Sequence, residues 1–131
     1  MRSVRLSLSS SPRQCFVDIL ENIGHIEGFL KDMGPFEIHE DQKTIFACQY
    51  ALLVISEAAK RLGPEGEKLC PGLPWRDIRG IGNQLRHAYD NLNSTMIWRV
   101  YQDDLPVLKL AVTQALARLT QPEAASVEVA R

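Results

Sequence analysis

The stretch from residue 41 to residue 62 constrains the fold more than any other part of the chain. Apolar side chains surround the helix predicted there on almost all sides: Ile45, Phe46, Ala47, Cys48, Tyr50, Ala51, Leu52, Leu53, Val54 and Ile55. A helix that is apolar all round has to be buried all round. The core of one small bundle covers only part of such a helix, so the remainder indicates a subunit interface. We therefore expect a homodimer.

Three further stretches show apolar residues at helical spacing. They cover residues 12–32, residues 74–89 and the segment after Ser94, and Pro106 is expected to kink or split the last one. Gly34-Pro35 and Gly63-Pro64 are expected to end the first two helices, with loops at 36–40 and 64–73. No stretch shows the alternation typical of a strand. The pattern predicts an all-α, up-and-down bundle of four to five helices whose first two form an antiparallel hairpin.

Length and composition limit the classes of function. A chain of 131 residues with a net charge of −1 predicts a single domain, 1–131, with an ordered core at about 12–119 and flexible tails at 1–11 and 120–131. This charge excludes general electrostatic capture of nucleic acid, so any RNA contact requires a local patch. Cys15, Cys48 and Cys70 form no Cys-x-x-Cys pair, which indicates reduced thiols in the cytoplasm and no metal site. No apolar run is long enough to span a membrane.

The helix predicted at 74–89 has two distinct faces. An apolar seam packs on the core, and the opposite side gathers Arg76, Arg79, Asn83, Arg86, His87 and Asp90 within roughly 100° of arc. Guanidinium groups bind phosphate well, and an imidazole can transfer a proton near neutral pH. A charged face of this kind is more often only a solvated surface. Gly80 and Gly82, however, each cost about 1 kcal/mol inside a helix, which indicates a close approach by another chain or a ligand.

Four blocks carry a resemblance to a known family. They are Glu57-Ala-Ala-Lys-Arg-Leu62, Leu73-Pro-Trp-Arg-Asp-Ile-Arg-Gly80, Asn83-Gln-Leu-Arg-His-Ala-Tyr89 and Asp104-Leu-Pro106. In order and spacing the chain resembles the HepT-like branch of the HEPN superfamily, from about residue 12 to residue 119. These are small helical toxins paired with minimal nucleotidyltransferase antitoxins, as in the MntA–HepT systems.

The resemblance implies a homodimeric toxin that cleaves RNA without a metal or other cofactor, at an Arg/His site shared by both subunits. His87 matches the family His, Asn83 the polar residue before it, and Tyr89 the Tyr to which the cognate nucleotidyltransferase adds AMP. The sequence departs from the family at Gly82, where the motif Arg is expected. Arg79 lies nearly one turn earlier, on the same helical ridge as Asn83 and His87.

RNA cleavage by this route needs the 2′-OH to lose a proton and the leaving 5′ oxygen to gain one. The sequence analysis assigns His87 as general acid or base, Arg79 as phosphate clamp supported by Arg86 and Arg76, and Asn83 as orienting residue. Trp75, Trp98 and Tyr101 are candidates for base stacking, although such residues more often belong to the core. The alternatives are a non-catalytic HEPN binding module that docks on a nucleotidyltransferase and a purely structural helical dimer.

Overall fold

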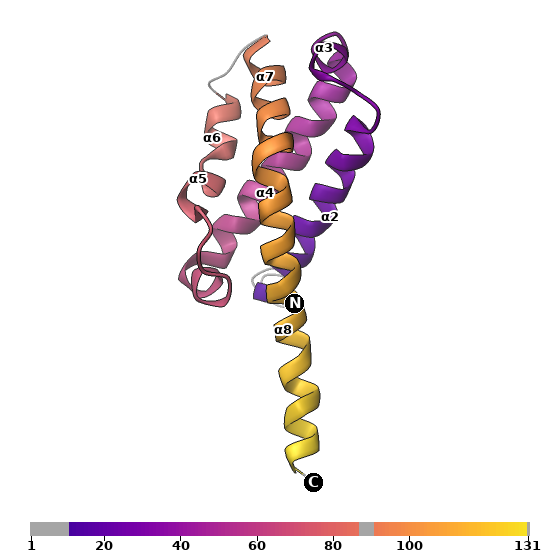
Figure 1. The fold of residues 1–131 in the computed structure, drawn as a ribbon. Helices are drawn as coiled ribbons and strands as arrows, with labels where there is room; N and C mark the ends of the chain where they lie inside the picture. The colour runs from indigo at the N-terminus through magenta and orange to yellow at the C-terminus, as the bar shows by residue number, and fades with distance from the viewer. Residues whose placement is uncertain (1–10, 87–90, 131) are drawn as a thin grey trace, which may run out of the picture.

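The structure, a computed structural model, describes the backbone of residues 11–86 and 91–130 and the side chains of residues 11–86 and 93–119. All regular elements in these ranges are helical, which confirms the all-α fold. α2 (Pro12–Leu30) and α4 (Gln42–Leu69) lie side by side as an antiparallel pair (Figure 1). α5 (Trp75–Arg79) and α6 (Ile81–Arg86) follow, and α7 (Asn91–Arg99) leads through the π-helix η1 (Val100–Asp104) into α8 (Leu105–Ala130).

The helix ends follow local chemistry. Ser11 accepts a hydrogen bond from the amide of Gln14 at the start of α2, and Asp41 accepts one from Thr44 at the start of α4, both at 3.0 Å. The loop expected at 36–40 is wrong, because α3 (Pro35–His39) occupies it. The helix expected after Ser94 begins earlier than predicted, since α7 starts at Asn91 and Ser94 lies inside it.

α4 is longer than the sequence predicted. Gly63 takes a left-handed conformation (φ 58°, ψ −152°), and the helix resumes at Pro64 and continues to Leu69. Glycine accepts this conformation without a steric penalty, and proline is well suited to begin a helical segment. Gly63-Pro64 therefore kinks α4 instead of ending it.

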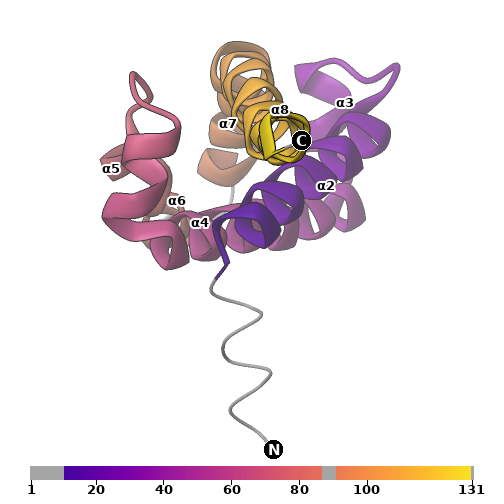
Figure 2. The ribbon, with the colours of Figure 1, turned by 90° about the horizontal axis from the view of Figure 1, so that it is seen from below.

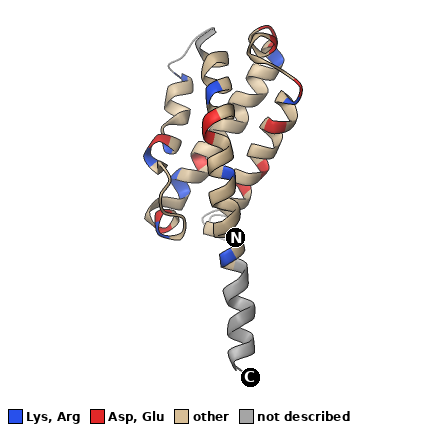
Figure 3. Ribbon diagram, viewed as in Figure 1, with Lys and Arg blue, Asp and Glu red and all other residues tan. Residues whose placement is uncertain are grey.

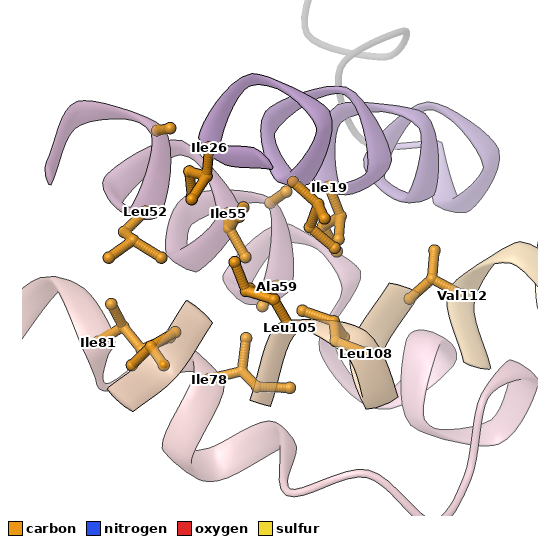
Figure 4. Close-up of a cluster of buried hydrophobic side chains, with 14 of the residues drawn as sticks. Ile19, Ile26, Leu52, Ile55, Ala59, Ile78, Ile81, Leu105, Leu108 and Val112 are labelled. Atoms are coloured by element: carbon orange, nitrogen blue, oxygen red, sulfur yellow. The ribbon is translucent and has the colours of Figure 1, made fainter. Parts of the chain in front are cut away.

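The core lies where α2, α4 and α8 meet. Figure 4 shows Ile19 and Ile26 of α2 above Leu52, Ile55 and Ala59 of α4, with side chains of the later helices closing the cluster. The outer face of α4 is not covered, because Phe46 is 59% exposed and Tyr50 is 69% exposed. Burial on all sides is therefore not achieved within one chain.

The last helix splits at the point that Pro106 indicated. Proline has no amide hydrogen to donate back along a helix, which disturbs the regular bonding just before it. The five residues Val100–Asp104 form the π-helix there. α8 then runs past Leu119 to Ala130, and Figure 2 shows α8 between α5 on one side and α2 on the other. The flexibility expected for residues 120–131 stays a prediction.

Candidate functional site

The helix predicted at 74–89 is not continuous. α5 ends at Arg79 and α6 begins at Ile81, so positions 79 and 83 lie on two helices and not on one continuous helical ridge. Ser56 of α4 stabilises this break, because its hydroxyl donates to the carbonyl oxygen of Arg79 at 2.8 Å and accepts from the amide of Gly82 at 3.3 Å. The sequence analysis did not identify Ser56. The feature of the sequence that could have identified Ser56 is a polar residue within an otherwise apolar stretch of the helix.

Gly82 is buried against α4 of the same chain. A Cβ at this position would lie 3.1 Å from Cδ1 of Leu53 and 3.3 Å from Oγ of Ser56. The close approach seen in the structure is that of the neighbouring helix α4. At Gly80 a Cβ would find its nearest neighbour at 3.5 Å, which is an ordinary contact. Of these two glycines, only Gly82 has a packing reason to be glycine.

Arg79 turns toward the kink in α4. Its Nη1 donates to Oε2 of Glu67 at 2.7 Å, its Nε to the carbonyl of Ala59 at 3.2 Å, and its Nη2 to the carbonyl of Gly63 at 3.2 Å. A carbonyl before a helix break lacks its usual amide partner, and the guanidinium provides one. The side chain is 25% exposed. Arg79 thus connects the part of α4 before the kink with the part after it.

The other arginines of the face are differently placed. Arg76, Asn83 and Arg86 are exposed, and within residues 11–86 and 93–119 no carboxylate pairs with Arg76 or Arg86. These side chains are accessible to an anionic ligand. His87 and Tyr89 lie outside the described residues. The structure therefore brings together Arg79 and α4, and leaves Arg76, Asn83 and Arg86 at the surface.

A cleft of about 390 Å³ separates α5 and α6 from η1 and α8. Its apolar lining includes Ile78, Ile81, Leu105 and Leu108, and its charged lining consists of Asp77, Arg99, Asp103 and Asp104. Arg99 forms an ion pair with Asp104 at 3.3 Å, and the carboxylates of Asp77 and Asp103 give the lining of the cleft a net negative charge. A negatively charged cleft repels phosphate. Figure 3 shows acidic and basic segments close together on α5.

The three cysteines are all buried, and none of them forms a disulfide. Burial raises the pKa of the Cys48 thiol to about 11, and it also raises the pKa of Cys15 and of Cys70. Such thiols are poor nucleophiles near neutral pH. Among the described side chains no group of three or more His, Cys, Asp or Glu is placed to hold a metal ion. No helix in the described part of the chain is long and apolar enough to cross a membrane.

The fold and the sequence blocks together define a HEPN-type helical bundle. The family model described as Ribonuclease HepT-like matches residues 19–115, and the chain belongs to this family. It is 32% identical over 102 residues to "Probable ribonuclease HepT" of Thermococcus cleftensis, which covers 78% of this chain and 93% of that protein. Two Methanocaldococcus jannaschii proteins with the name "Putative RNase" are 28% and 34% identical, each over 72% of this chain and over 87% and 78% of their own lengths. No solved structure gives a significant match.

Proposed function

We propose that this chain is the toxin of a toxin–antitoxin pair and cleaves single-stranded RNA without a metal ion. The observation that carries the proposal is the combination of family membership with an exposed Asn83 and Arg86 at the end of α6, directly before His87. Membership in a family described as ribonucleases makes RNA the substrate expected for this surface. The site residues are proposals that rest on the sequence block and on this exposure.

The chemistry is an internal displacement at phosphorus. The 2′ oxygen forms a bond to phosphorus while the bond to the 5′ oxygen breaks. One imidazole takes the 2′-OH proton, and another gives a proton to the leaving oxygen. Each chain contributes one His87, so a two-fold dimer supplies both groups across a shared groove. Arg86, supported by Arg76, neutralises the charge that grows on the phosphate oxygens, and Asn83 orients the phosphate.

The contacts of Arg79 differ from those of a free phosphate ligand. Its guanidinium already donates to Glu67 and to two carbonyl oxygens of α4, and these bonds occupy the fork that would bind a phosphate. Its role as phosphate clamp stays a prediction, and its contacts favour a structural role. Arg86 carries the clamp in the mechanism proposed here.

The dimer is supported by the uncovered face of α4. Phe46 and Tyr50 lie one turn apart, and Leu53 follows on the same side of the helix, where it also faces Gly82 of α6. A second chain packed on this face would therefore lie beside α6. A cognate nucleotidyltransferase antitoxin is proposed to silence the site by adding AMP to Tyr89, which puts a phosphate and a base next to the catalytic groups.

A second function is favoured by one observation. Gly82 occupies the position of the motif Arg and is closed in by Leu53 and Ser56, so no guanidinium reaches the site from there. A HEPN domain without that group can act as a non-catalytic module that docks on the nucleotidyltransferase. The two functions differ in one result, because only the enzyme is toxic when expressed alone.

The test compares the wild-type chain with His87→Ala, with growth and cleavage of a labelled single-stranded RNA in EDTA as readouts. We expect toxicity and cleavage from the wild type and neither from the variant. His25→Ala is the matched control, since His25 is an exposed imidazole on α2, and it should behave as wild type. Wild-type protein that is folded, harmless and inactive on RNA would reject the enzyme and leave the binding module.

A further inference from the structure

A second hollow lies between α3 and α7. It has a volume of about 310 Å³ and is lined by Pro35, Phe36, His39, Ser94, Thr95 and Trp98. Phe36 is 71% exposed, the most exposed of the large apolar side chains described. Trp98 is only half-buried. Two aromatic side chains thus line an open hollow whose remaining lining is partly polar.

The polar lining is held in place by the packing of α3 on α7. Ile38 is fully buried and anchors α3 to the core, while Glu37 accepts from the amide of Gly34 at 2.9 Å. Nδ1 of His39 lies 3.1 Å from Oγ of Ser94, a hydrogen bond that joins the two helices. This bond leaves Nε2 as the imidazole nitrogen that a ligand can meet.

The aromatic lining is also positioned in advance. Trp98 packs against Tyr101 with ring centroids 5.6 Å apart and a tilt of 55° between the rings. Tyr101 and Trp98 both pack against the core. Because the Tyr101 ring packs against one side of the Trp98 indole, the indole is already ordered before a ligand binds. Phe36 projects from a short helix that begins at Pro35 and is fixed by Ile38.

The size of the hollow limits the class of ligand. Pockets for small ligands have about 300–1,000 Å³, so this one accepts a single ring system. A stable protein interface buries about 800 Å² on each partner, far more than these six side chains provide. Aromatic side chains with adjacent hydrogen-bonding groups are the usual receptors for unpaired bases of single-stranded RNA. We propose that the hollow binds one nucleobase of the RNA, a nucleotide flanking the phosphate that is cleaved.

The position in the fold agrees with this assignment. α6 ends at Arg86 and α7 begins at Asn91, and Figure 1 shows these ends and α3 at the same end of the bundle. Ser94 follows Asn91 by one helical turn, about 5 Å along the axis. That the ligand is RNA rests on the proposed ribonuclease function. Binding of the base itself does not require that the RNA is cleaved.

The charges near the hollow predict how it binds. Glu37 on α3 and Glu40 directly after it are exposed, so phosphate contacts are unfavourable there and the attraction has to come from stacking. Removal of a stacking side chain should therefore weaken binding equally at all salt concentrations. Removal of Arg86 should instead reduce the dependence of affinity on salt, because each phosphate contact adds about 0.7 to the slope for a single strand.

The experiment titrates the full chain with an eight-nucleotide 2′-O-methyl oligouridine, which lacks the attacking 2′-OH, and follows tryptophan fluorescence. We expect quenching in the wild type and an affinity about 5- to 100-fold lower in Phe36→Ala, with the salt slope unchanged. Trp98→Phe should lose the quenching, because Trp75 is buried and bonded to the carbonyl of Cys70. Phe29→Ala is the matched control: Phe29 is an exposed phenylalanine on α2 that stacks on His25 and does not line the hollow.

The outcomes separate this site from the ribonuclease function. Binding that depends on Phe36 without any RNA cleavage would support the hollow and reject the enzyme. Cleavage with an unchanged affinity in Phe36→Ala, or failure of the wild type to bind the probe, would overturn the hollow and leave the enzyme. An abasic oligonucleotide of the same length that binds as tightly as oligouridine would also overturn it, since only phosphate contacts would then remain.

Discussion

Arg79 donates to Glu67 at 2.7 Å across the kink that Gly63 makes in α4. Arg79 belongs to α5 and Glu67 to the part of α4 after the kink, while the carbonyls of Ala59 and Gly63 lie on the near side of it. One guanidinium therefore fixes three positions along the bent helix. A residue with the sequence features of a phosphate ligand has a structural function in the isolated chain.

Arg79→Ala should lower the free energy of unfolding by about 1–3 kcal/mol, because it leaves two carbonyls of α4 without their donor. Arg79→Lys should recover only part of this loss, since an ammonium cannot reach both carbonyls and Glu67 together. Urea denaturation measures the change. Arg76→Ala is the matched control from the same helix and should stay within about 0.5 kcal/mol of wild type.

The same variants decide the role of Arg79 in catalysis. A structural role predicts that cleavage by Arg79→Ala falls only as far as its folded fraction falls. A phosphate clamp predicts loss of cleavage in a protein of unchanged stability. The second result, together with an active Arg86→Ala, would show that Arg79 and not Arg86 binds the phosphate.

Gly82→Arg restores the family residue but should destabilise this chain. The new side chain starts 3.1 Å from Leu53 and 3.3 Å from Ser56, so the packing of α6 on α4 has to open, at a cost of about 1–3 kcal/mol. Gly80→Arg introduces the same group where the nearest atom is 3.5 Å away, and it should be tolerated. Thermal unfolding compares the two. Equal melting temperatures would mean that the crowding at Gly82 has no energetic effect.

The helices could be predicted from the sequence because their signals are local. Ser11-Pro12 and Asp41 begin helices, and Pro106 marks the change at η1, because caps and prolines act on their own neighbours. The break at Gly80 could not be predicted, since it depends on Ser56, which lies 23 residues from Arg79 in the chain. The orientation of Arg79 toward Glu67 is a long-range contact of the same kind. The family block named the candidate site residues, and periodicity alone did not predict that Arg79 would contact Glu67.

Alkaline pH should destabilise the fold through the buried thiols. The pKa of Cys48 rises from 9.0 to about 11 in the folded chain, so between these values the unfolded chain loses a proton that the folded chain keeps. Stability is therefore complete below about pH 9 and falls as the pH rises toward 11. Cys48→Ala should flatten this decline in urea midpoints measured from pH 8 to pH 11. A decline of the same steepness in the variant would assign it to other groups.

Tyr89 is the proposed point of control by the nucleotidyltransferase. Attack of its hydroxyl oxygen on the α-phosphorus of ATP would form the Tyr–AMP bond and release pyrophosphate. Co-expression with a cognate nucleotidyltransferase antitoxin should therefore add one or more AMP units, visible in the intact mass. Tyr89→Phe should remain toxic and unmodified. Tyr50→Phe is the matched control, because it removes a tyrosine hydroxyl but keeps the aromatic ring of the proposed dimer face, and it should be modified like wild type.

The homodimer should depend on the outer face of α4. Tyr50→Glu places a charge in the centre of the apolar surface formed by Phe46, Tyr50 and Leu53, so burial against a second chain would cost the desolvation of that carboxylate. Sedimentation at micromolar concentration should give about twice 14.7 kDa for the wild type and a monomer for the variant. Val107→Glu changes an apolar side chain of similar exposure on α8 and should remain dimeric. If both His87 imidazoles act on one phosphate, the monomeric variant has to lose RNA cleavage while it keeps its helical fold. A monomer that still cleaves RNA would show that each chain contains a complete site.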